Sequence, residues 1–158
     1  KLLGAAYADK GRENNALAFP SFGPERRGAP VRAFTKLSSK PVLDRSETEK
    51  ADYIIILDDT LYSDSLKNLL KNNGKIIINS RKIADEKIIS FDCDSIAEEL
   101  RLPTVNTILL GIFSAVSGAV SVKDIERSID GYMPEKIREK NKQAVRRSAE
   151  EVLKWNHI

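Results

Sequence analysis

Residues 51–80 read ADYIIILDDTLYSDSLKNLLKNNGKIIINS, and this stretch decides the fold class. Residues 53–57 form a continuous apolar run rich in β-branched side chains, as expected for a strand buried on both faces, and residues 75–78 have the same character. Between the two runs we expect a helix that ends at Gly74 and carries Leu66, Leu69 and Leu70. This order predicts a right-handed βαβ unit with parallel strands.

The elements on either side extend this unit into an α/β pattern, with strands early in the chain and helices late. Alternating or apolar runs predict further strands at residues 15–19, 31–37 and 87–91. Helices are predicted at residues 1–10, at 104–120, from Asp94 or Ser95 to residue 100, after a capping box of Ser121 and Asp124, and from Pro134 to about residue 155. We therefore expect one α/β domain over residues 1–158, with a mostly parallel sheet and helices on both faces.

The composition narrows the class of protein. The chain has 158 residues, of which 41% are hydrophobic and 31% charged, and this balance fits a globular domain with a real core. A net charge of +3 does not suggest nucleic-acid binding. The longest apolar run, residues 105–120, is shorter than the roughly 20 residues that span a bilayer, so no membrane segment is predicted. With no signal peptide visible, we expect a cytoplasmic protein.

The first helix begins without a capping residue or an initiator methionine. We therefore expect the domain to be N-terminally incomplete, with an upstream strand and turn missing. The single cysteine, Cys93, and the single histidine, His157, exclude a structural zinc site, an iron–sulfur cluster or a disulfide framework built from this chain alone. No metal ligand and no catalytic residue is predicted.

The most informative loop is FPSFGPERRGAP, residues 19–30. It follows a strand, which would place it at a strand's carboxyl end, where open α/β sheets bind ligands. Its prolines stiffen the backbone, while Arg26 and Arg27 offer planar donors for phosphate or carboxylate, with Glu25 able to hold one of them. Two interpretations remain open: a preorganised site for an anion or a partner, or a rigid turn whose arginines are solvated or paired within the domain.

Polar residues also end two of the predicted strands. Asp58 and Asp59 can serve acid–base chemistry or bind magnesium, although solvated or capping carboxylates are more common at such positions. Asn79 and Ser80 end the next strand, where they either line the same crevice or bond their own turn. Cys93 has no neighbouring histidine or second cysteine, so a buried or idle thiol is favoured over a nucleophile.

The apolar helix at residues 104–120 carries small residues at helical spacing. They are Gly111, Ser114, Ala115 and Gly118, and they permit a close approach of another element. We favour packing within the core over a subunit interface. The last helix sets lysines and arginines opposite its apolar residues, which is typical of a solvated basic face, although an acidic partner remains possible.

Residues 18–31, AFPSFGPERRGAPV, resemble the signature of the gamma subunit, or gamma domain, of the 2-oxoacid:ferredoxin oxidoreductases, of which pyruvate:ferredoxin oxidoreductase is the best-known member. The runs at residues 51–58 and 75–80, VNT at 105–107 followed by a Leu-Leu-Gly, and EKN at 139–141 are similar to the same family. The resemblance extends nearly end to end. Family members usually open with a strand and a Gly-Gly-Gln-Gly type of turn, which this sequence lacks.

The resemblance implies a three-layer Rossmann-like domain and a place in a complex. Such complexes oxidatively decarboxylate a 2-oxoacid with coenzyme A, giving acyl-CoA, carbon dioxide and reduced ferredoxin. Thiamine diphosphate lies in the alpha and beta parts, and iron–sulfur clusters lie in the beta and delta parts. The implied partners are the alpha, beta and delta subunits, with ferredoxin reached through the complex. Pyruvate is the expected substrate, and the isolated chain is expected to be inactive.

In the family the gamma part is associated with access of coenzyme A, and the signature loop supplies the candidate residues. The predicted binding set is Ser21, Phe22, Gly23, Glu25, Arg26, Arg27 and Asn79. No cofactor is expected on this chain alone. The alternative interpretation is a stand-alone α/β module that binds a nucleotide or an acyl carrier without redox activity, and companion chains in a preparation from the native source would separate the two.

Overall fold

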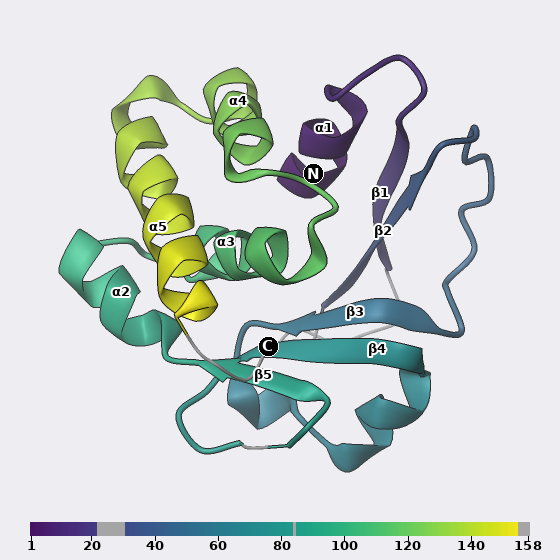
Figure 1. The fold of residues 1–158 in the computed structure, drawn as a ribbon, viewed down its shortest axis with the longest axis horizontal. Coiled ribbons are helices and arrows are strands. Elements are labelled where there is room, and N and C mark those ends of the chain that lie inside the picture. The colour runs from purple at the N-terminus through teal and green to yellow at the C-terminus, as the bar shows by residue number, and fades with distance from the viewer. Residues whose placement is uncertain (22–30, 84, 155–158) are drawn as a thin grey trace.

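The computed structural model describes residues 1–21, 31–83 and 85–154, which form an α/β fold (Figure 1). The predicted fold class is therefore confirmed. The elements are, in chain order, α1 (Leu2–Ala8), β1 (Asn15–Ser21), β2 (Arg32–Ser38), β3 (Ala51–Ile56), the 3₁₀ helices η1 (Asp59–Leu61) and η2 (Asp64–Leu69), β4 (Leu70–Asn79), β5 (Ile88–Phe91), α2 (Cys93–Leu100), α3 (Asn106–Ser117), α4 (Val122–Tyr132) and α5 (Glu135–Leu153).

A parallel sheet of three strands, in the order β3-β4-β5, forms the centre of the fold. Its middle strand is fully buried at Ile76, Ile77 and Ile78. Because side chains alternate along a strand, Ile77 joins the cluster under the α-helices, while Ile76 and Ile78 join a smaller cluster on the opposite face. The apolar runs at residues 53–57 and 75–78 are thus neighbouring parallel strands, as predicted. Burial on both faces holds for β4, whereas β3 is half-buried over most of its length and Leu57, just after it, is exposed.

β1 and β2 form a separate antiparallel ribbon in which Ser21 pairs with Arg32. The loop at residues 19–30 does follow a strand, as predicted, but β1 belongs to this ribbon. The inference that this places the loop at the ligand-binding edge of the open sheet is therefore wrong. Ten residues separate Ser21 from Arg32, whereas a parallel crossover takes a dozen or more. Helix α1 lies against the ribbon, where a Cβ on Gly4 would stand 3.6 Å from the Cβ atoms of Ala16 and Ala18.

The predicted α-helix between the first two strands of the parallel sheet is wrong. The crossover consists of η1 and η2, and β4 already begins at Leu70, which pairs with Ala51 and is buried in the smaller cluster. Gly74 lies inside β4 rather than at a helix end; a Cβ there would approach the Ala51 carbonyl oxygen to 2.9 Å. Burial and strand pairing of Leu70 thus outweigh the helical spacing of the leucines.

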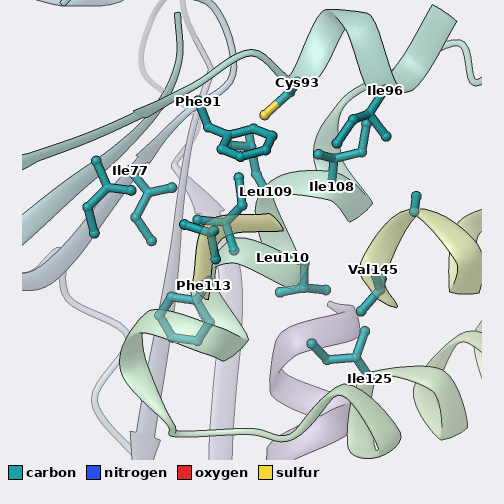
Figure 2. Close-up of a cluster of buried hydrophobic side chains, with 14 of the residues drawn as sticks. Ile77, Phe91, Cys93, Ile96, Ile108, Leu109, Leu110, Phe113, Ile125 and Val145 are labelled. Atoms are coloured by element: carbon teal, nitrogen blue, oxygen red, sulfur yellow. The ribbon is translucent and has the colours of Figure 1, made fainter. Parts of the chain in front are cut away.

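The α-helices cover one face of the parallel sheet, and the main hydrophobic cluster lies between them and the strands (Figures 1 and 2). Figure 2 shows Leu109, Leu110 and Phe113 of α3 at the centre of this cluster. On the other side of α3, a Cβ on Gly111 would stand 2.1 Å from Ser148 Oγ of α5. At Gly111, the favoured interpretation of packing within the core is therefore confirmed.

Side chains fix where the helices begin. The capping box of Ser121 and Asp124 is present at the start of α4, and α5 begins directly after Pro134. Helix α2 begins one residue earlier than predicted, because its cap is Asp92, which accepts from the Ser95 backbone N–H at 3.1 Å. Among the described residues, no helix combines the length and apolarity needed to cross a membrane.

Candidate functional site

A cleft of about 360 Å³ lies at the carboxyl ends of the three parallel strands. Its lining residues come from just after β3, from the end of β4 and the turn that follows it, and from the start of α2: Leu57, Asp58, Asp59, Asn79, Ser80, Arg81, Lys82, Asp92 and Asp94. This edge is where open α/β sheets bind ligands. The prediction that the residues ending the first two strands line one crevice is confirmed.

Asn79 ties the walls of the cleft together. Its Nδ2 donates to the Leu57 carbonyl oxygen at 3.2 Å and to Asp94 Oδ1 at 3.0 Å, and its Oδ1 accepts from the Cys93 backbone N–H at 3.0 Å. The residue is nearly buried. The interpretation that Asn79 bonds its own turn is wrong, because its amide instead joins the end of β3 to the start of α2. Its predicted part in binding coenzyme A stays a prediction.

Asp58 and Asp59 each bond within the chain. Asp58 caps η1, and the Thr60 hydroxyl and then the Thr60 backbone N–H hold the pKa of its carboxyl below the usual range. Asp59 accepts a hydrogen bond from Ser80 Oγ at 2.8 Å. The capping interpretation of Asp58 is thus confirmed. Within residues 1–21, 31–83 and 85–154, no group of three His, Cys, Asp or Glu residues is arranged to hold a metal ion.

The charges of the cleft lining favour cations over anions. Arg81 pairs with Asp92, Nε to Oδ2 at 2.8 Å, and also donates to Ser95 Oγ. Burial is the largest influence on the Asp92 carboxyl and raises its pKa, but the hydrogen bonds from Ser95 and Arg81 together outweigh it and lower the pKa. Four aspartates and two cations line the cleft, a net charge of about −2, which does not suit a phosphate ligand.

Ser21 is the one residue of the predicted loop set that the structure describes. It ends β1, and its hydroxyl donates to Glu47 Oε1, in the segment between β2 and β3. The other predicted residues of that loop lie outside the described residues: Phe22, Gly23, Glu25, Arg26 and Arg27. For these residues, the site for an anion or a partner and the rigid turn with solvated or paired arginines both remain predictions. His157 also lies outside the described residues.

Sequence reasoning missed a buried polar pair between α3 and α5. Thr107 Oγ1 donates to Asn141 Oδ1 at 2.8 Å, and Asn141 Nδ2 donates to the Ile137 carbonyl oxygen. Both side chains are buried. The residues had been noted only as parts of two separate motifs, VNT and EKN. A polar residue on the apolar face of each helix was the available signal, since buried polar groups require partners.

Cys93 has no exposed surface, and burial, aided by the charges of Asp94 and Asp92, raises the pKa of its thiol far above the usual range. The interpretation as a buried thiol is confirmed. We expect iodoacetamide at pH 8.5 to alkylate the folded chain at least about a hundredfold more slowly than the chain in urea, because the thiolate is the reactive form. Mass spectrometry gives both rates at this single cysteine. Equal rates would contradict the burial of Cys93.

Comparison with known proteins gives one consistent result. Residues 1–151 match the family described as pyruvate ferredoxin/flavodoxin oxidoreductase. Pyruvate synthase subunit PorC of Methanothermobacter thermautotrophicus is 38% identical over 159 aligned residues, which cover 98% of this chain and 87% of the relative. The pyruvate/ketoisovalerate oxidoreductases common subunit gamma of Pyrococcus furiosus is 35% identical over 84% of this chain and 78% of its own.

A solved structure agrees with these relatives. The crystal structure of pyruvate oxidoreductase subunit PORC from Thermotoga maritima superposes with a TM-score of 0.77 at 30% identity, covering 94% of this chain and 85% of that one. The resemblance seen in the sequence is thus confirmed by both the sequence match and the arrangement of the elements. The chain belongs to the pyruvate ferredoxin/flavodoxin oxidoreductase family.

Proposed function

We propose that this chain is the gamma subunit of a 2-oxoacid:ferredoxin oxidoreductase. The observation that carries this proposal is the similarity to a pyruvate synthase subunit along 98% of the chain. The complex would oxidise pyruvate or a related 2-oxoacid with coenzyme A, giving acyl-CoA, carbon dioxide and reduced ferredoxin. Relatives named for pyruvate and for pyruvate/ketoisovalerate support this substrate class.

In this proposal the redox chemistry belongs to alpha, beta and delta subunits. Thiamine diphosphate on those subunits supplies the decarboxylation chemistry, and their iron–sulfur clusters carry the electrons to ferredoxin. The chain has one cysteine, while a typical cluster takes four thiolate ligands, so the residues of this chain fit no such cluster. The chain contributes binding and packing instead, and it works in the cytoplasm.

The part of this chain that acts on coenzyme A is the loop with Arg26 and Arg27. Guanidinium groups bind phosphate with two parallel hydrogen bonds, and this suits the phosphates of coenzyme A. The acidic lining of the described cleft supports assigning the phosphates to the loop rather than to the cleft. Holding coenzyme A in place raises the effective concentration of its thiol beside the acyl group formed on a partner subunit.

Assembly provides the test of the subunit assignment. The tagged chain is co-expressed with the alpha, beta and delta subunits encoded in the same genome, and 2-oxoacid-dependent reduction of ferredoxin is assayed. We expect the four chains to co-purify with activity, and the tagged chain alone to be inactive. Full activity of the isolated chain, or nucleotide binding by a monomer that never associates with these subunits, would favour the stand-alone module.

The double variant Arg26→Ala/Arg27→Ala tests the loop. In the assembled complex we expect the KM for coenzyme A to rise at least about tenfold, because each desolvated charge-assisted contact contributes roughly 1.5–3 kcal/mol. Arg12→Ala, at an exposed position, is the control and should leave this KM unchanged. An unchanged KM with loss of partner subunits would make the loop an interface, and no effect on either would leave its arginines without a role.

A further inference from the structure

The two faces of the parallel sheet are covered unequally. All five α-helices contribute buried residues to the main cluster on one face. On the other face, the buried cluster consists of Ile56, Leu70, Ile76, Ile78 and Ile88, and the crossover covers it with the side chains of Tyr62 and Leu66. Figure 1 shows this crossover, the short turns between β3 and β4, on the side of the sheet away from α3. Since parallel sheets are normally covered on both faces, this thin layer leaves room for a second one.

The crossover exposes leucines to solvent. Leu57, Leu61 and Leu69 are 47%, 46% and 39% exposed, respectively, and all belong to one stretch of thirteen residues, 57–69. We call this stretch the crossover surface. Leu57 follows the carboxyl end of β3 and Leu69 precedes the amino end of β4, so these leucines are spread along the whole crossover. Isolated exposed apolar residues are ordinary, whereas extended exposed apolar surface is typical of an interaction site. Leu57 also forms part of the wall of the cleft, so the cleft opens beside this surface.

The crossover surface is acidic, although the whole chain carries a charge of +3. Its stretch contains Asp58, Asp59 and Asp64 but a single cation, Lys67. That cation is already engaged, because Lys67 Nζ lies 3.1 Å from Asp64 and 2.7 Å from Asp85. Asp85 pairs with Lys67, and Lys50 donates to the Asn68 carbonyl oxygen, so this group holds four carboxylates and two ammonium groups. Arg81 and Lys82 line the cleft beside Asp58 and Asp59, but Asp92 and Asp94 line it too, so the excess of negative charge remains. A partner surface that matches this charge is basic.

The basic helix α5 carries an excess of the opposite charge. Two of its arginines are used within the chain: Arg146 pairs with Glu126 and Glu139, and Arg147 with Glu99 and Glu151. The prediction that this helix has a solvated basic face is thus wrong for Arg146 and Arg147, which form ion pairs within the domain. The crossover surface combines three exposed leucines with an excess of carboxylates.

We propose that the crossover surface docks a partner subunit whose own surface presents apolar side chains interspersed with lysine and arginine side chains. The partner would lie over Leu57, Leu61 and Leu69 and add a further layer outside the crossover, while its cations approach Asp58, Asp59 and Asp64. This inference rests on the proposed function, because it requires that the chain works inside a complex.

The test uses two matched double variants in the co-expressed complex. Leu61→Lys/Leu69→Lys places positive charge against the basic partner, and Leu61→Glu/Leu69→Glu places negative charge at the same positions. We expect the lysine pair to lower the fraction of tagged chain that carries partner subunits at least about tenfold, since like charges across an interface are strongly unfavourable. The glutamate pair should lower it less.

Tyr132→Lys/Leu153→Lys is the control, because it adds two lysines at apolar residues that are 64% and 65% exposed on α4 and α5. It should assemble normally. Unchanged melting temperatures of the isolated variants would show that they fold. Normal assembly of the lysine pair would overturn the docking surface, and equal losses for both pairs would overturn the basic partner. Failure of the unaltered chain to assemble would instead overturn the proposed function itself.

Discussion

Replacing Gly111 with alanine is expected to lower the free energy of unfolding by about 1–3 kcal/mol, as is typical of overpacked cores. The new Cβ would stand 2.1 Å from Ser148 Oγ and 2.4 Å from the Val145 carbonyl oxygen, so α3 and α5 cannot keep their present separation. Alanine favours a helix by up to about 1 kcal/mol over glycine, and this gain offsets only part of the loss. Urea unfolding of the isolated chain gives the value.

Gly131 supplies a matched control for this substitution. It lies inside α4, and a Cβ there would meet no heavy atom within 4 Å. Gly131→Ala is therefore expected to raise the free energy of unfolding by about 0.4–1 kcal/mol. Adding Ser148→Ala to the Gly111 variant should recover little, because the Val145 carbonyl oxygen still blocks the Cβ. Equal stability of the two glycine variants would show that α3 and α5 are not this close.

Thr107→Val is expected to cost about 1–3 kcal/mol, although valine has nearly the shape of threonine. The loss arises because Asn141 Oδ1 would be buried without its donor. Asn141→Leu should cost a similar amount, whereas the double variant should cost less than the sum by about 0.5–3 kcal/mol. Urea unfolding of the four proteins completes the cycle.

Thr104→Val is the control for the threonine change. Its hydroxyl also bonds an asparagine, Asn106, but the residue is exposed, so the expected change in stability is within about 0.5 kcal/mol. Strict additivity of Thr107→Val and Asn141→Leu would mean that the two side chains do not form the buried bond.

Local patterns predicted the parallel sheet and most of the helices. The apolar runs at residues 53–57 and 75–78 can be buried only inside a layered fold, and the capping box at Ser121 depends on neighbours in the chain. The crossover was mispredicted because its leucines satisfy a helical spacing equally well, and only the pairing of Leu70 with Ala51 decides between the two structures. Pairing across 19 positions is not visible in a local pattern.

The position of the candidate site could be predicted from the sequence, but its hydrogen bonds could not. The predicted strand ends identified Asp58, Asp59, Asn79 and Ser80 as candidates for one crevice, because parallel strands end at one edge of a sheet. The hydrogen-bond partners of Asn79 are Leu57, just after β3, and Cys93 and Asp94 of α2, and their positions follow from the tertiary fold. The ribbon of β1 and β2 shows the same limit, since a strand's pattern does not tell which sheet it joins.

The bonds of Asn79 also bear on how the cleft can respond to an occupant. Its amide joins the backbone at Leu57 to that at Cys93, and Cys93 is itself part of the main cluster. Spreading the walls would leave buried groups unpaired, at a cost of roughly 1–3 kcal/mol each. A molecule or side chain that enters the cleft therefore meets a preformed shape. The cleft selects its occupant by fit and does not adjust to it.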